Sequence, residues 1–401
     1  MWGQVSSAFT STIEPSHYAS RHIITSRFNR NPWIPRSPHP APVGRSGLRR
    51  CLIGRFSGRM SSRVYRLGHL RQLSSRAGVH VSPFQLGGMS IGESPWAQVG
   101  MGNMTKESSF KLLDTFWEQG GNFIDTAGNY QDGTSEKFIR RVGEQRGIRD
   151  HLVLATKYSS NRWLENHSVK RAAHTGNSAK SLRNSVEASL KDLRTTYIDI
   201  LYVHWWDWDT SVYEIMDALH TYVQRGVVLY LGISDTPAWV VARANEYARR
   251  TGKTPFSIYQ TAYSIMERSA EREILPLIRD EGTPIQVGEK GRLMPWQTQW
   301  ERTPEEKKVC DALEKVAIAY VMHKAPFVFP IIGGRKPEQI VANIEALDIA
   351  LSDDQIAFLD TAKPLDLGFP NYMIGDGTSY PQGLIWSTLA KTPRAGPIRP
   401  N

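Results

Sequence analysis

Ile198-Asp-Ile-Leu-Tyr-Val-His204 is a short hydrophobic run that ends in an imidazole. Two earlier runs have the same form: Asn122-Phe-Ile-Asp125 ends in a carboxylate, and Leu152-Val-Leu-Ala-Thr-Lys157 ends in an ammonium. Runs of this length that are apolar on both faces are typical of parallel strands covered by helices. Three strands that each end in a polar group indicate a sheet whose C-terminal edge carries chemistry.

The rest of the chain extends this pattern. From about Val79 onward, short apolar runs alternate with longer helical patterns at intervals of roughly 30 residues, which is typical of βα units. We predict strands over 83–88, 122–126, 152–157, 198–204, 227–234, 256–262 and 327–333. We predict helices over 106–118, 135–145, 179–193, 212–224, 239–249, 272–280 and 304–323.

Two α/β architectures alternate in this way. A doubly wound dinucleotide-binding sheet needs Gly-x-Gly-x-x-Gly after its first strand, and Gly87-Gly-Met-Ser-Ile-Gly92 lacks that spacing. We therefore predict a (β/α)8 TIM barrel. The only candidate for its seventh strand is Thr283-Pro-Ile-Gln-Val287, and Gly-Glu-Lys-Gly-Arg follows at once, so we expect strand 7 and its following loop to be atypical or shortened. If that strand were absent, the barrel would have two open edges.

The charge of the chain is unevenly distributed. The net charge is +10, but residues 1–80 hold thirteen Arg, no Lys and one acidic residue, Glu14, so they carry +12 and the other 321 residues carry −2. We expect no nucleic-acid partner, because no known binding module accompanies this charge. We expect no membrane span, because no apolar run approaches roughly 20 residues. Cys51 and Cys310 lack metal-ligand spacing, so we expect no metal.

The basic residues belong to a leader over 1–65, which has three interpretations. Its content of Arg, Ser and Pro resembles a mitochondrial transit segment, it would also suit a disordered extension, and translation could begin at Met60. Composition does not separate the three. We expect a cytoplasmic protein, or a mitochondrial one if the leader is a transit segment. Residues 66–401 would form the barrel, with a C-terminal tail from about 364.

Four residues together suggest one reaction. Tyr130 lies five residues after Asp125, and the C-terminal strand ends of a barrel converge, so both would lie near Lys157 and His204. Reduction of a carbonyl needs a hydride on carbon and a proton on oxygen. An ordinary tyrosine, with a pKa of about 10, holds its proton tightly, and Lys157 would lower that pKa. Asp125 would hold the ammonium, and His204 would donate a hydrogen bond to the substrate oxygen.

Each of the four also has a purely structural explanation. Asp125 could cap a turn, and Tyr130 could be a half-buried loop aromatic. Lys157 could extend along the surface at a strand end, and His204 could be a core imidazole. Taken together, however, all four follow predicted strands two, three and four, on the face where barrel enzymes place their catalytic groups. We therefore predict a carbonyl reductase site.

These segments resemble the aldo-keto reductase superfamily. The stretch from Gly121 to Tyr130 is similar to its strand-2 signature, which carries the Asp and the proton-donating Tyr, and Lys157 and His204 match the positions of its Lys and His. Three further segments are similar to the fungal aryl-alcohol dehydrogenase and norsolorinic acid reductase branch: Leu229–Trp239, Phe329–Lys336 and Pro364–Pro370. The resemblance covers about residues 66–401.

The resemblance implies NADPH, bound across the barrel mouth. The candidate cofactor-binding residues are Gly88, Met89, Asp125, Ser234, Asp235, Gln260, Gly333, Gly334, Arg335, Lys336, Gln339 and Asn343. Ser234, Asp235 and Gln260 would meet the nicotinamide carboxamide. The two glycines at 333 and 334 precede a predicted helix start, which favours a phosphate. Arg335 and Lys336 oppose the helix dipole, so they favour a 2′-phosphate, although an ordinary surface helix is the alternative.

The expected function is NADPH-dependent reduction of aldehyde or ketone carbonyls to alcohols, running reversibly as an alcohol dehydrogenase. The small-molecule substrate would meet Tyr130 and His204. Trp205, Trp206 and Trp208 could form an aromatic wall that favours aromatic substrates, or they could be barrel packing. The oligomeric state is not readable.

Two segments depart from the family pattern. Relatives usually carry in strand 7 an aromatic that stacks on nicotinamide, and then a glycine-rich loop over the pyrophosphate; residues 283–297 keep little of this. About a dozen residues are also missing near 313–324. The alternative hypothesis is therefore a catalytically impaired barrel that binds NADPH or a protein partner without turnover.

Overall fold

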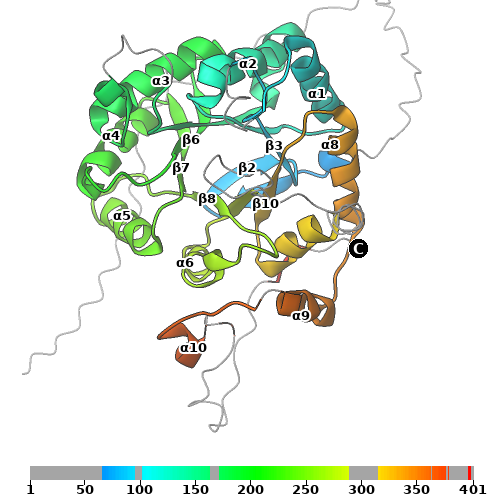
Figure 1. Ribbon diagram of the computed structural model, residues 1–401. Coiled ribbons are helices and arrows are strands. Elements are labelled where there is room, and N and C mark those ends of the chain that lie inside the picture. The colour runs from blue at the N-terminus through cyan, green and yellow to red at the C-terminus, as the bar shows by residue number, and fades with distance from the viewer. Residues whose placement is uncertain are drawn as a thin grey trace, which may run out of the picture. The chain divides into compact units, whose positions relative to one another are not determined.

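Eight short parallel strands form one closed barrel in the computed structural model (Figure 1). They are β3 Gln85–Gly87, β4 Phe123–Asp125, β5 Val153–Tyr158, β6 Ile198–Val203, β7 Val228–Ser234, β8 Ile258–Ala262, β9 Ile285–Gly288 and β10 Val328–Ile332. Each pairs with the next, and β10 pairs with β3 to close the ring. The predicted (β/α)8 barrel is confirmed.

The structure describes residues 66–94, 102–162, 171–288, 315–362, 364–375, 378 and 396–398. All of these belong to one compact unit, Ser62–Asn401. The predicted leader and residues 289–314 lie outside the described residues, and with them the loop expected after the seventh strand and the start of the predicted helix 304–323. No described helix has the length and apolar character needed to cross a bilayer.

The seventh strand of the barrel, β9, is short but complete. It pairs in parallel with β8 on one side, where Ile285 lies opposite Tyr259. On the other side it pairs in parallel with β10, where Ile285 lies opposite Val328. Because both of its edges are paired, the two open edges that a missing strand would create do not occur. The possibility that the barrel fails to close at this strand is therefore wrong.

Helices follow the strands and surround them (Figure 1). They are α1 Lys106–Glu118, α2 Thr134–Arg146, α3 Ala179–Leu193, α4 Val212–Gln224, α5 Ala238–Arg250, α6 Ile274–Glu281, a helix over 315–324, and α8 Pro337–Ile344. Three of them begin at a hydroxyl that accepts a hydrogen bond from a backbone N–H of the first turn: Thr105, Ser178 and Ser211. The bounds of α1, α3 and α4 are those predicted.

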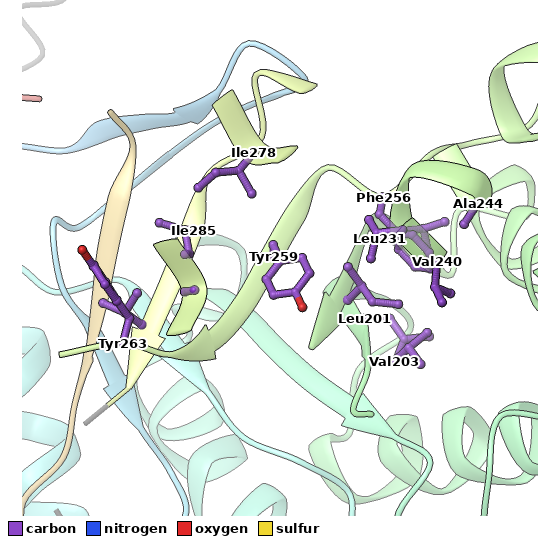
Figure 2. Close-up of a cluster of buried hydrophobic side chains, with 14 of the residues drawn as sticks. Leu201, Val203, Leu231, Val240, Ala244, Phe256, Tyr259, Tyr263, Ile278 and Ile285 are labelled. Atoms are coloured by element: carbon purple, nitrogen blue, oxygen red, sulfur yellow. The ribbon is translucent and has the colours of Figure 1, made fainter. Parts of the chain in front are cut away.

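Alternate strand residues divide the core into an inner and an outer layer, because successive side chains of a strand point to opposite faces. On β5, Leu154 packs outward under the helices, whereas Ala155 packs inside the barrel. The largest outer cluster lies between strands β6 to β9 and helices α4 to α6. Figure 2 shows part of it, with Leu231 and Phe256 gathered near Val240 of α5.

An antiparallel hairpin, β1 Arg71–Ser74 and β2 Ala77–Val81, precedes the first barrel strand and was not predicted. Its buried residues Leu73, Ala77 and Val81 pack against inward-facing barrel residues such as Phe123 and Val153, which begin their strands. The hairpin therefore covers the N-terminal end of the barrel and leaves the C-terminal end for the site.

The C-terminal tail contacts the loop that follows β8. After α9, Asp353–Ala362, the tail runs to the short α10, Asn371–Ile374. Arg268 donates to the carbonyl of Asp360, and Arg272 donates to the carbonyl of Asp366 at 3.0 Å. Because the loop after β8 lies at the C-terminal end of the barrel, these bonds bring the tail to the face of the predicted site.

Candidate active site

Three strand ends bring the predicted catalytic residues together. Asp125 is the last residue of β4, Lys157 lies next to the end of β5, and His204 follows the last residue of β6. The strands β4, β5 and β6 are direct neighbours, with Asp125 opposite Ala155 and Lys157 opposite Tyr202. The convergence expected from the sequence is present in the structure.

Lys157 is the centre of this arrangement. Its Nζ donates to Asp125 Oδ2 at 2.6 Å, to the carbonyl of Thr126 at 2.8 Å and to the hydroxyl of Tyr130 at 3.4 Å. An ammonium has three N–H groups, so each has one of these partners. Lys157 and Asp125 are both buried, and the ion pair between them compensates for part of the lost hydration.

The ammonium remains charged despite its burial. Burial by itself lowers the pKa of Lys157, but the charge of Asp125 and the interactions with Tyr130 and Asp125 outweigh it, so that the pKa lies above its ordinary value. At neutral pH the site therefore holds one fixed cation directly beneath the tyrosine hydroxyl.

The pKa of Tyr130 differs from the expectation. The sequence argument had Lys157 lower it, but the structure gives a pKa above the ordinary value, because burial of the phenol outweighs the nearby ammonium. Lys157 does lower the pKa as expected, but burial raises it by more, so the net shift is upward. Tyr130 consequently keeps its proton at neutral pH and can act as a donor, and Lys157 would stabilise the phenolate left after transfer.

His204 lies edge-on to Tyr130, with ring centroids 5.8 Å apart. Its Nδ1 is 3.4 Å from the hydroxyl of Ser160, and its backbone N–H donates to Ser159. Close packing, and secondarily the charge of Lys157, lowers the pKa of His204 to about 3. The ring is therefore neutral at ordinary pH and carries one N–H donor and one acceptor nitrogen.

A strained turn places the tyrosine. Tyr130 begins the 3-10 segment η3, Tyr130–Gly133, in which Gln131, Asp132 and Gly133 all have positive φ. The buried side chain of Gln131 fixes this turn by donating to the carbonyls of Met89 and Gly102, each at 2.8 Å. No sequence signal marked Gln131, because a positive φ is uncommon for glutamine.

A hydrogen-bond network below the site was also missed by the sequence analysis. Gln260 Nε2 donates to Asp125 Oδ1 at 3.1 Å and to Gln286 Oε1 at 2.9 Å, and the hydroxyl of Tyr202 donates to the same Gln286 oxygen. The sequence did indicate that Tyr202 faces the same side as His204, because the two lie two residues apart on a strand and such residues share a face. Gln286 lay in the candidate seventh strand but was not singled out.

Two groups of predicted cofactor residues adjoin the catalytic four. The backbone N–H of Gly88 donates to the carbonyl of Asp125 at 2.7 Å, and a Cβ at Gly88 would lie 2.8 Å from that oxygen, so only glycine fits. Met89 follows it and accepts from Gln131. Ser234 ends β7 opposite Gln260, and Asp235 comes directly after it.

The predicted phosphate site lies between β10 and α8. Gly333, Arg335 and Lys336 are exposed, and among the described residues no ion pair involves either cation. Gln339 Oε1 accepts from the backbone N–H groups of Arg335 and Lys336, at 2.9 and 3.1 Å. Gly334 packs against Gln339, and the predicted contact residue Asn343 is largely buried on α8. A helix start with two unpaired cations can hold a phosphate.

The three tryptophans of the predicted aromatic wall, Trp205, Trp206 and Trp208, lie in different surroundings. Trp205 donates its indole N–H to Ser160 at 2.9 Å, which ties it to the partner of His204. Trp206 packs against the outer core. Trp208 is 67% exposed and contacts Trp239 of α5, with ring centroids 6.4 Å apart.

Comparison with known proteins agrees with this geometry. The model of the Aldo/keto reductase family matches residues 83–289 and 292–363. An aryl-alcohol dehydrogenase [NADP(+)] of Phanerodontia chrysosporium is 48% identical over 79% of this chain and 91% of its own length. A norsolorinic acid reductase of Aspergillus flavus is 44% identical over 83% of this chain and 94% of its own length. The family match and these relatives, together with the barrel, show that the chain belongs to the aldo/keto reductase family of oxidoreductases.

Proposed function

We propose that the protein reduces the carbonyl of an aromatic aldehyde or ketone with NADPH, and oxidises the corresponding alcohol with NADP+ in the reverse direction. The observation that carries the proposal is the Lys157 ammonium, whose three N–H groups point to Asp125, the Thr126 carbonyl and the Tyr130 hydroxyl. Relatives named aryl-alcohol dehydrogenase [NADP(+)] and norsolorinic acid reductase support the substrate class and the cofactor.

The proton for the substrate oxygen would come from Tyr130. When a carbonyl carbon gains a hydride, its oxygen becomes an alkoxide, which is a stronger base than a phenolate. Tyr130, protonated at neutral pH, would transfer its proton at that point, and the Lys157 ammonium would stabilise the phenolate. The neutral ring of His204 would donate its N–H to the same oxygen and orient it.

The residues around the site fit NADPH, which when bound supplies the hydride. The side-chain oxygen Oε1 of Gln260 makes no hydrogen bond among the described residues, so it can accept from a carboxamide, and Ser234 lies opposite Gln260 in register. The exposed Arg335 and Lys336 at the start of α8 suit a 2′-phosphate.

The test is the loss of NADPH absorbance in the presence of an aromatic aldehyde. We expect turnover by the wild type and a loss of roughly 10² to 10⁴ in kcat for Tyr130→Phe, with NADPH binding retained. Tyr158→Phe is the matched control, since Tyr158 is a buried tyrosine on the same strand as Lys157 that packs outward. NADPH binding without turnover by the wild type would instead favour the impaired barrel.

A further inference from the structure

Gln286 is a buried polar side chain that the proposed mechanism does not use. It lies on β9 inside the barrel and has no exposed surface. Its Oε1 accepts from both Tyr202 and Gln260, whereas its Nε2 has no partner among the described residues. Burial of an unpaired amide N–H2 opposes folding, because the group loses water and gains no acceptor. One half of the Gln286 amide is therefore paired with two donors, and the other half is unpaired.

The chemistry of its neighbours fixes the direction of every bond. Asp125, paired with Lys157, is a carboxylate and can only accept. The Gln260 atom that faces it must therefore be the N–H2 group. The second N–H of that group points to Gln286, which must present its carbonyl oxygen, and Tyr202 must then donate to the same oxygen. Burial holds the pKa of Tyr202 well above its ordinary value, so the hydroxyl keeps its proton.

We propose that Gln286 is a positioning residue that locks the Gln260 amide in one orientation for the nicotinamide. With both side-chain N–H groups of Gln260 engaged by Asp125 and Gln286, the side-chain oxygen Oε1 is the atom left to meet a ligand. The nicotinamide carboxamide offers the N–H2 donor that this oxygen requires. Without Gln286, the Gln260 N–H2 group would lose one of its two acceptors, and the amide would be held less firmly in this orientation. This inference rests on the proposed function, since it takes NADPH as the ligand.

Gln85 provides a matched control. It lies on β3 opposite Ile331, it is fully buried, and neither atom of its amide has a partner among the described residues. Its neighbour Leu86 packs outward, so Gln85 faces the barrel interior as Gln286 does. Replacement of Gln85 by leucine removes a buried amide without touching the network that reaches Asp125.

The experiment measures the affinity of the full chain for two ligands by titration calorimetry. NADPH carries the nicotinamide, and 2′-phospho-ADP-ribose keeps the phosphates but lacks it. The variants are Gln286→Leu, which removes the acceptor; Gln286→Glu, whose buried and therefore protonated carboxyl keeps an acceptor oxygen; and Gln85→Leu. Gln286→Met takes the place of Gln286→Leu if the leucine variant does not fold.

We expect Gln286→Leu to bind NADPH about tenfold more weakly, the loss that one hydrogen bond gives, while 2′-phospho-ADP-ribose binding changes less than about twofold. Gln286→Glu should restore most of the NADPH affinity, and Gln85→Leu should match the wild type. Gln85→Leu should melt at or above the wild-type temperature, because it removes an amide that has no partner among the described residues. Gln286→Leu should melt at a lower temperature, because it leaves the buried Tyr202 hydroxyl and one Gln260 N–H without their acceptor.

The inference is overturned by unchanged NADPH affinity in Gln286→Leu, by an equal loss for both ligands, or by the same loss in Gln85→Leu. Its failure is distinct from failure of the proposed function. A wild type that binds NADPH but reduces no aldehyde would end the proposed function, and the binding comparison would still decide the role of Gln286. A wild type that binds no NADPH would overturn both.

Discussion

Burial acts in opposite directions on the two hydrogen-bond donors of the site. It raises the pKa of the Tyr130 phenol and lowers that of the His204 imidazole, so both side chains are neutral at ordinary pH beside the charged Lys157. The site therefore pairs one fixed cation with two neutral donors. Residue types and strand ends predicted which side chains would meet, but not the direction of the Tyr130 shift, because desolvation depends on what packs around a group.

The lowered pKa of His204 predicts acid sensitivity. In an unfolded chain the ring titrates at 6.5, and in the folded protein at about 3. Between these values the unfolded state binds the proton, so stability is full above about pH 6.5 and falls as the pH drops toward 3. The protonation of His204 in the unfolded state should lower the free energy of unfolding by about 2 kcal/mol at pH 5 relative to pH 8. Urea unfolding at both pH values would measure it.

His204→Gln is the control for this prediction, since glutamine is neutral at both pH values. All other titrating groups contribute to both proteins, so the difference between the two pH-dependent losses isolates the imidazole. An identical loss in wild type and variant would contradict a neutral, desolvated histidine.

Among the structural elements, the turn η3 contributes most to positioning the tyrosine. Gln131 and Asp132 have φ of 52° and 50°, and a non-glycine residue in such a conformation costs of order 1–3 kcal/mol. The Gln131 side chain compensates by bonding to two backbone carbonyls that flank the first barrel loop. The following Gly133 has no room for a Cβ, which would lie 2.9 Å from Nε of Arg162. The turn is therefore held from two sides.

Gln131→Leu should release this turn. The substitution leaves the carbonyls of Met89 and Gly102 without their donor, so we expect a loss of about 2 kcal/mol in unfolding free energy and a fall in kcat, because Tyr130 is no longer held over Lys157. The exposed Gln355 caps α9 at Ser352, and Gln355→Leu should leave kcat unchanged. Full activity in Gln131→Leu would show that the turn does not position the tyrosine.

In the described unit as a whole, one end of the barrel is mainly apolar inside, with Gln85 as a buried polar exception, and the other end carries the buried charges. At the N-terminal end, the hairpin residue Leu73 packs into an apolar layer with Phe123 and Phe329. At the C-terminal end, the interior carries the buried Asp125 and Lys157. This separation keeps the chemistry away from the part of the core that supplies apolar stability, so the two can be altered independently.

Leu73→Ala tests that independence. Leu73 has no exposed surface, so truncation should cost about 2–5 kcal/mol of unfolding free energy. We expect kcat for aldehyde reduction to remain within about twofold, because the proposed catalytic residues lie at the other end of the barrel. Gln72→Ala, at the exposed neighbouring position, should change neither quantity. A kcat loss as large as that of a catalytic variant would contradict the separation.

The sequence by itself determined most of the barrel strands and helices and the four catalytic candidates, but not the hairpin of β1 and β2. Helix α1 has a capping residue and a helical pattern of apolar residues, and strand β6 is a continuous buried run; neither needs a distant contact to be recognised. Lys157 and His204 stand at strand ends that any parallel barrel brings together. Only the tertiary structure decided that the short β9 closes the ring and that Gln286 reaches Gln260, since both depend on pairing between strands. Pairing register and desolvation are properties of the assembled fold, and no local pattern encodes them.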